Sequence, residues 1–267
     1  MSGDDSWTSL RRFTPARIAL GRAGGSRPTK EVLAFRLAHA AAVDAVHTPL
    51  DVNALRRDID AMQLSLPVVE LATAAADGAT YLQRPDFGRR LDEPSRSALA
   101  QTNLAAAGAD VCIIVADGLS AIAARENGPA VVKALVPLLR GAGFSLAPLV
   151  LLKHGRVGAM DEIGAALRAR VAIILLGERP GLQTPSSLGA YLVFGPRLGR
   201  TDAERNCLSN IRGDGLPPSA AAQKLVWLVN AALKRQLSGV ALKDETHDPL
   251  LEPELEPEPE PKDAKKP

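Results

Sequence analysis

The chain has 267 residues, of which 46% are hydrophobic and 3% aromatic, and it carries a formal net charge of +2. No apolar run approaches the roughly 18 residues that a membrane-spanning helix needs, and the opening sequence lacks the apolar core of a signal peptide, so we expect a cytoplasmic protein with no membrane contact. Residues 1–242 hold 28 Lys and Arg against 21 Asp and Glu, a net charge of +7, but aromatic side chains for base stacking are scarce, so we expect no nucleic-acid binding.

Helical patterns dominate the first third of the chain. Residues 28–47 begin with a proline that suits a first helical turn, and apolar residues such as Leu33 and Leu37 then recur at helical spacing. A second helix is expected over about residues 51–62. The sequence therefore predicts an N-terminal helical region over residues 1–94.

After residue 95, short apolar runs with the length of buried strands alternate with helical patterns. The strand-like runs are residues 109–120, 146–155 and 170–181, and the helical patterns between them are residues 128–143 and 159–170. This alternation is typical of βαβ units and a parallel sheet. We therefore predict an α/β fold in which residues 95–240 form a parallel, doubly wound, Rossmann-like domain.

Two later segments differ from this pattern. Residues 201–212 mix Asn and Ser with apolar residues, which predicts a partly buried loop. Residues 241–267 alternate proline with glutamate and have little to bury, so we expect an extended, disordered, acidic tail.

Polar segments follow each of the predicted strands directly. They are residues 117–120, 153–157 and 177–181. In an open parallel sheet, ligands bind in the crevice beyond the carboxyl ends of the strands. We therefore expect these segments to form one rim of a binding site, where glycines let a ligand approach the backbone.

Several residue patterns allow other chemistry. Residues 21–31 are rich in glycine but lack the Walker phosphate-loop pattern. His39 and His47 lie eight positions apart, whereas a helical metal pair needs a spacing of four, so we expect no metal site. Cys112 lies in an apolar run and should be buried. Cys207 would act as a nucleophile only if a base or a cation lowered its pKa, so packing against a ligand is the preferred interpretation.

A hydrolytic triad would draw on Ser120, His154 and Asp117. The surrounding "DGLS", however, does not match the G-x-S-x-G elbow of α/β-hydrolases. Because the motif does not match, a free-standing nucleotide-binding or hydrolytic α/β enzyme is kept only as the alternative function.

Four long motifs occur in a fixed order along the chain. They are "LRRFTPARIALGRAGGSRPTKEVLAFRLAHAAAVDAVHTPLD", "VCIIVADGLSA", "GERPGL" and "SLGAYLVFGPRLGRTDAERNCLSNIRGDGL". Together they resemble the small subunit of ethanolamine ammonia-lyase over residues 7–237. The resemblance is specific, because several long motifs match in the correct order.

The resemblance implies a carbon–nitrogen lyase that uses adenosylcobalamin to convert ethanolamine to acetaldehyde and ammonia. Such an enzyme is a hetero-oligomer of a large barrel subunit and this small subunit. The substrate and the catalytic groups would belong to the large subunit, so this chain would carry no catalytic residue and would be inactive alone. The cofactor supplies the radical chemistry, and the protein supplies binding and orientation.

The family's cobalamin contacts carry over to three positions of this sequence. They are Val157 in "GRVG", Glu178 in "GERPG" and Cys207 in "ERNCLSN". Apolar contact with the corrin ring suits Val157 and Cys207, whereas Glu178 can accept hydrogen bonds from the amide side chains around the ring.

The chain departs from the family pattern near two of its motifs. "RVGAMDEIG" stands where the family usually reads close to "RVALGDEIG", which leaves open how Gly158 and Met160 affect the backbone around Val157. Ile122 stands where the family commonly has arginine. These changes keep a third function open, a scaffold that has lost contact with the cofactor.

Two further expectations concern the cofactor and the location. The D-x-H-x-x-G signature is absent, so we expect dimethylbenzimidazole to stay the axial ligand. Little sequence precedes Trp7, where family members sent to a bacterial microcompartment often carry an extension, so the microcompartment is kept as the alternative location.

Overall fold

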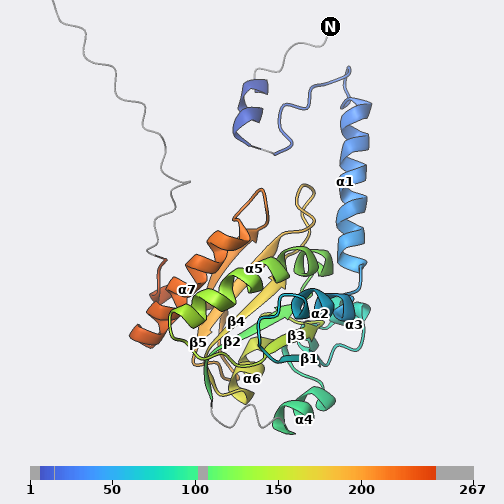
Figure 1. Cartoon of the computed structure of the whole chain (residues 1–267). Coiled ribbons are helices and arrows are strands. Elements are labelled where there is room, and N and C mark those ends of the chain that lie inside the picture. The colour runs from blue at the N-terminus through green and yellow to red at the C-terminus, as the bar shows by residue number, and fades with distance from the viewer. Residues whose placement is uncertain (1–6, 15, 102–107, 245–267) are drawn as a thin grey trace, which may run out of the picture.

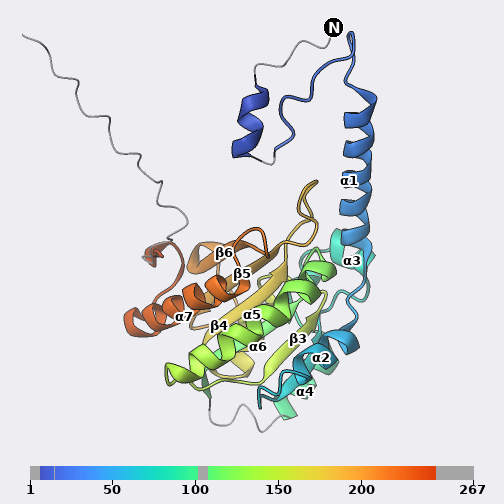
Figure 2. The same cartoon turned by 45° about the horizontal axis from the view of Figure 1, so that its top comes forward.

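The structure of the chain, a computed structural model, describes residues 7–14, 16–101 and 108–244. Over these residues it forms a six-stranded sheet with helices on both faces, and the long helix α1 stands away from the sheet (Figures 1 and 2). The strands are β1 (Val68–Ala72), β2 (Ala109–Ala116), β3 (Leu149–Lys153), β4 (Ala169–Gly177), β5 (Leu188–Phe194) and β6 (Arg205–Ile211). The α-helices are α1 (Thr29–His47), α2 (Val52–Asp60), α3 (Gly78–Gln83), α4 (Glu93–Gln101), α5 (Ala121–Gly141), α6 (Ala159–Ala166) and α7 (Pro218–Arg235). The short 3-10 helices are η1 (Thr8–Phe13), η2 (Phe87–Arg89), η4 (Asp202–Glu204) and η5 (Gly239–Ala241).

The strand order across the sheet is β1-β3-β2-β4-β5-β6. The first four strands run parallel, with Ile114 of β2 opposite both Val150 of β3 and Ile174 of β4. Strands β5 and β6 continue the sheet in antiparallel pairings. The predicted α/β fold is therefore confirmed, and its parallel, doubly wound part carries an antiparallel extension on one side.

The sheet separates two apolar layers. Val111, Ile113 and Val115 of β2 pack with α2, α5 and α7 on one face, whereas Cys112 and Ile114 pack with α4 and α6 on the other. Parallel strands buried on both faces consist of continuous apolar residues rather than alternating ones. This explains why the apolar runs in the sequence predicted β2, β3 and β4.

The prediction of a loop over residues 201–212 is wrong. The segment contains η4 and then β6, an edge strand that pairs with β5 alone. Only the ends of β6, Arg205 and Ile211, are buried. An edge strand tolerates polar residues such as Asn206 and Ser209 because it is paired and covered on fewer sides, and this composition made the strand resemble a loop.

The two predicted N-terminal helices are confirmed as α1 and α2. Leu55 and Ile59 of α2 lie in the core, whereas α1 buries only Ala45. Strand β1 also comes from this region and pairs with β3, so the sheet draws on residues on both sides of position 94. Residues 245–267, most of the predicted disordered tail, lie outside the described residues.

Helix α1 exposes large apolar side chains along its length. Leu33 is 57% exposed and Leu37 74%, and Phe35 and Val43 are also exposed. The apolar spacing that predicts this helix therefore does not form a face buried within the chain. None of the helices among the described residues combines the length and the apolar composition needed to cross a membrane.

Candidate functional site

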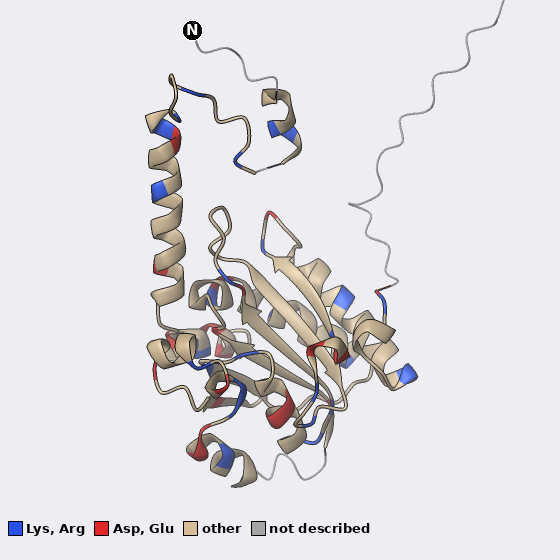
Figure 3. Cartoon of the chain, turned by 180° about the vertical axis from the view of Figure 1, so that it is seen from behind, with Lys and Arg blue, Asp and Glu red and all other residues tan. Residues whose placement is uncertain are grey.

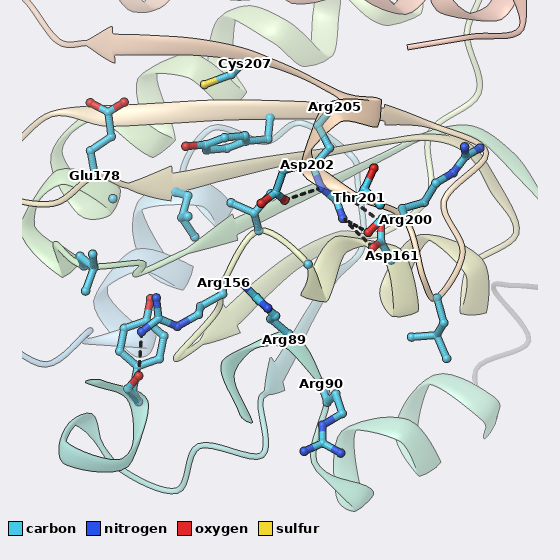
Figure 4. Close-up of a pocket in the computed structure, with 18 of the residues that line it drawn as sticks. Arg89, Arg90, Arg156, Asp161, Glu178, Arg200, Thr201, Asp202, Arg205 and Cys207 are labelled. Atoms are coloured by element: carbon cyan, nitrogen blue, oxygen red, sulfur yellow. Dashed lines mark hydrogen bonds and ion pairs between the residues drawn. The ribbon is translucent and has the colours of Figure 1, made fainter. Parts of the chain in front are cut away.

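A cavity of about 1070 Å³ opens at the carboxyl ends of the parallel strands (Figure 4). Leu119 after β2, Val157 after β3 and Glu178 after β4 all line it, so the three predicted segments do meet at one rim. Tyr191 of β5 and Cys207 of β6 form the opposite part of the lining. The volume lies above the range of about 300–1,000 Å³ that suits drug-sized ligands, so the cavity can take part of a larger molecule.

Asp117 ties the ends of β2 and β3 together beside this rim. Its carboxylate accepts hydrogen bonds from the backbone N–H groups of His154 at 2.9 Å and Gly155 at 3.0 Å. The hydroxyl of Tyr81 donates to the carbonyl oxygen of Gly155 at 3.1 Å. Burial raises the pKa of Asp117, and the backbone N–H donors oppose that rise. These bonds fix the turn after β3, and that turn places Val157 at the cavity.

The same turn depends on the glycine at position 155. A Cβ atom there would lie 2.7 Å from the Cβ of Ala116 and 2.7 Å from the Cδ2 of Leu152. No larger residue fits without moving one of the two strands, because such contacts are far closer than van der Waals distances. The close approach of β2 to the turn after β3 therefore requires Gly155.

The residues of the hydrolytic alternative do not form a triad. The hydroxyl of Ser120 donates to the carbonyl oxygen of Pro185 and caps α5. The Nδ1 atom of His154 lies 2.9 Å from the carbonyl oxygen of Ala75. Asp117 is engaged by backbone N–H groups rather than by the imidazole. The nucleophile, base and orienting carboxylate of a triad need hydrogen bonds to one another, and the structure shows none here.

Glu178 follows β4 and is half-buried in the cavity lining. Its Oε2 atom accepts hydrogen bonds from the hydroxyl of Ser187 and from the backbone N–H of Asn210. A Cβ atom at Gly189 would lie 3.0 Å from Oε1, so a glycine leaves room for the side chain. Oε1 has no hydrogen-bond donor among the described residues, so this oxygen can accept an N–H group of a ligand.

Cys207 lies on β6, opposite Tyr191 of β5. Its thiol is exposed, and its sulfur lies 3.6 Å from the hydroxyl oxygen of Ser209. Burial raises the pKa of Tyr191 to about 12, and the neighbouring Cys207 adds to that rise. Within the described part of the chain, no histidine or cation contacts the sulfur, so the geometry suits packing against a ligand better than nucleophilic attack.

The structure thus brings Val157, Glu178 and Cys207, the three positions carried over from the family, into one cavity. They come from three separate parts of the chain, and two of them are presented by strand ends that the sequence predicted. Their contact with cobalamin stays a prediction.

The structure places the departures from the family pattern at three different sites. Met160 lies fully buried in the apolar layer between α6 and the sheet, away from the cavity. Gly158 is the N-cap residue of α6 and lies under the side chain of Arg89. Ile122 lines a separate cavity of about 330 Å³ beside α2, together with Asp58. Only the change at position 158 therefore lies in the lining of the main cavity.

Arginines that sequence reasoning did not single out form much of the wall. Arg205 makes two hydrogen bonds of 2.8 Å with the carboxylate of Asp161, and these side chains are only 3% and 5% exposed. Arg200 bonds Glu204 and the carbonyl oxygens of Gly195 and Phe194. Hydrogen bonds lower the pKa of Glu204 to about 2. The largest contribution comes from the backbone N–H of Thr201, and the next comes from the side chain of Arg200. These bonds hold the segment between β5 and β6 in place.

Two more arginines, Arg89 and Arg156, line the cavity opposite Glu178 (Figure 4). Arg156 was part of a predicted strand-end segment, so the residues after β3 contained a signal for it. Arg89 comes from η2, in the region that the sequence predicted as helical, and no local pattern indicates that this segment reaches the site.

The C-terminal end of α1, which is its end nearest the sheet, lies beside the same cavity (Figure 1). A second cavity of about 470 Å³ is lined by Val46 and His47 of α1 and shares Tyr81 and Leu119 with the first. The end of the protruding helix and the candidate site are therefore neighbours.

Comparison with known proteins identifies close relatives. Residues 4–243 match the family described as "Ethanolamine ammonia-lyase light chain (EutC)". Proteins named "Ethanolamine ammonia-lyase small subunit" are similar over most of the chain. One from Ralstonia nicotianae is 49% identical over 92% of this chain and 91% of its own length. One from Xanthomonas campestris pv. campestris is 50% identical over 92% and 90%, and one from Azotobacter vinelandii is 50% identical over 91% and 89%.

Proposed function

This chain belongs to the ethanolamine ammonia-lyase light chain family, and from that membership we propose that it is the small subunit of an adenosylcobalamin-dependent ethanolamine ammonia-lyase. In this proposal the hetero-oligomer converts ethanolamine to acetaldehyde and ammonia. The chain binds cobalamin at its interface with the large subunit, and the large subunit holds ethanolamine and the catalytic groups.

The observation that carries the proposal is the single cavity lined by Val157, Glu178 and Cys207. A corrinoid is a broad apolar macrocycle edged by amide side chains. Val157 and Cys207 offer apolar contact for the ring, and the free Oε1 of Glu178 offers an acceptor for a side-chain amide. The residues present therefore fit the cofactor.

In this proposal the chain's own residues bind and orient the cofactor rather than react. When bound, adenosylcobalamin supplies the radical that begins the reaction. Asp117 and Gly155 fix the turn that presents Val157, and the Asp161–Arg205 pair fixes the wall beside Cys207. A preorganised wall keeps water from one side of the cofactor and costs no rearrangement on binding.

Helix α1 supports the proposed association with a large subunit. Its charged residues are Lys30, Glu31, Arg36 and Asp44, so much of its surface is apolar or small (Figure 3). Apolar side chains such as Leu33 and Leu37 gain by leaving water, and within this chain they remain exposed. A partner surface along α1 would bury them.

The test is to mix the purified chain with the large subunit, adenosylcobalamin and ethanolamine and to measure acetaldehyde release. We expect turnover only when all components are present. Turnover by the isolated chain would instead support a free-standing enzyme, and a subunit complex that does not retain cobalamin would support a scaffold. The location, in the cytoplasm or in a bacterial microcompartment, is a separate proposal that fractionation of the source cells tests.

A further inference from the structure

The main cavity carries an excess of positive charge. Its described lining contains six arginines against three carboxylates. Arg90, Arg200 and Arg205 form ion pairs with carboxylates. The described residues provide no carboxylate partner for the remaining three, Arg89, Arg156 and Arg179.

Arg156 is held in one orientation with unused donors. Its guanidinium lies 4.4 Å from the centre of the Tyr81 ring, and its Nη2 donates to the carbonyl oxygen of Tyr81 at 2.9 Å. Its Nε atom is buried and has no hydrogen-bond partner among the described residues. A stacked arginine keeps its charge and its planar fork of donors. Nη1 is neither buried nor hydrogen-bonded to another described residue, so Arg156 can bind an acceptor through Nη1.

Arg89 is brought beside Arg156 by two glycines. The backbone N–H of Arg156 donates to the carbonyl oxygen of Gly88 at 2.8 Å. A Cβ atom at Gly88 would lie 2.9 Å from the Cγ of Arg156, and one at Gly158 would lie 3.3 Å from the Cγ of Arg89. Each arginine stem therefore packs on a glycine of the opposite segment. Figure 4 shows both side chains on the side of the cavity that faces Glu178 and Cys207.

Two arginines without a carboxylate partner on one side of the cavity indicate an anionic ligand group. Closing a partner over the cavity would remove water from them, and an unpaired charge in such a place is costly. A neutral amide would offset little of that cost, whereas a phosphate accepts paired hydrogen bonds from arginine and cancels charge. The amide side chains of a corrinoid are neutral. The phosphodiester of the nucleotide loop is the anionic group at the periphery of cobalamin.

We propose that Arg156 and Arg89 bind the phosphodiester of cobalamin's nucleotide loop, so that this chain selects corrinoids that carry the loop. The inference rests on the proposed function and adds to it a separate subsite, across the cavity from Glu178. It assigns the ring and its amides to Val157, Glu178 and Cys207, and the phosphate to the two arginines.

The test compares three ligands on the complex of both subunits, kept in the dark. They are adenosylcobalamin, adenosylcobinamide phosphate, which lacks the nucleoside, and adenosylcobinamide, which lacks the phosphate too. Dissociation constants come from equilibrium dialysis with visible absorption. We expect Arg156→Gln and Arg89→Gln each to raise the dissociation constants of the two phosphate-bearing ligands by about tenfold or more. Binding of adenosylcobinamide should change by less than about twofold, because it makes no charged hydrogen bond to these residues.

Controls separate the subsite from the fold and from the proposed function. Arg170→Gln removes an arginine that pairs with Asp110 at the amino ends of β2 and β4, the ends away from the cavity, and should leave all three constants unchanged. If Arg156→Gln disturbs assembly, as judged by thermal unfolding and co-purification, the exposed Arg89 carries the test. The phosphate assignment would be overturned if the substitutions raised the dissociation constants of all three ligands equally, or if they changed none of them. A wild-type complex that binds none of them would instead refute the proposed function.

Discussion

The buried ion pair between Asp161 and Arg205 provides a quantitative test of how the cavity wall is held. Asp161→Asn keeps the size of the side chain but removes the charge that faces the guanidinium. The two side chains are 5% and 3% exposed, so water cannot replace the lost partner. Removing one member of a buried pair costs about 3–5 kcal/mol. Arg205 retains Asp202 at 3.3 Å and the carbonyl oxygen of Arg200 at 3.1 Å, so we expect the lower end, about 3 kcal/mol.

The assay is urea and thermal unfolding of the isolated chain followed by circular dichroism. A loss of about 3 kcal/mol corresponds to a fall of roughly 6–12 °C in Tm for a domain of this size. Asp60→Asn is the matched control, because the pair of Asp60 with Arg56 is exposed and should contribute less than about 1 kcal/mol. The reasoning is refuted if Asp161→Asn destabilises the chain no more than Asp60→Asn does.

Four further predictions follow from the site and from α1. Glu178→Ala should weaken cobalamin binding by the subunit complex by about 1–3 kcal/mol in equilibrium dialysis, and an unchanged affinity would remove this residue from the site. Gly155→Ala should lower the free energy of unfolding by about 1–3 kcal/mol because its Cβ would meet Ala116; a value near zero would show that the turn after β3 can shift. Leu37→Glu should weaken co-purification with the large subunit yet change the stability of the isolated chain by less than about 0.5 kcal/mol, because Leu37 is exposed; normal co-purification would contradict a role for α1. A thiol reagent at pH 8 should label Cys207 but not Cys112 in the folded chain, since burial raises the pKa of Cys112 to about 12 and keeps it protonated, and mass spectrometry of labelled peptides would reveal any other outcome.

The parallel part of the fold could be predicted because each of its strands and helices has a recognisable pattern of apolar residues in the sequence. Strands β2, β3 and β4 are buried on both faces and appear as apolar runs separated by helical patterns. The edge strand β6 could not be recognised, since its pairing with β5 is antiparallel and its exposed residues are polar. Strands β1 and β5 were also missed. Glu70 interrupts the apolar run of β1 and is exposed, and in β5 Leu188 is followed by Gly189 and Ala190, which are poor strand formers.

The site could be predicted where it depends on strand ends. Val157 and Glu178 follow strands that the sequence indicated, and topology alone places such residues at one edge of a sheet. For Cys207 the sequence indicated only packing against some ligand. Its place in the same cavity as Val157 was reached through the family resemblance, because its strand was not recognised. Arg89 was missed because its position depends on contacts between η2 and the turn after β3, which are far apart in the sequence.

The protruding α1 has a consequence for assembly. At about 1.5 Å per residue, its 19 residues extend about 28 Å, and its C-terminal end borders the cavity. In the proposed complex, the large subunit would thus be engaged at two points, one along the helix and one at the cavity mouth. Once either point binds, the other is held at high effective concentration. A change at one point, such as Leu37→Glu, should therefore lower the yield of the complex, whereas changes at both points should abolish the complex.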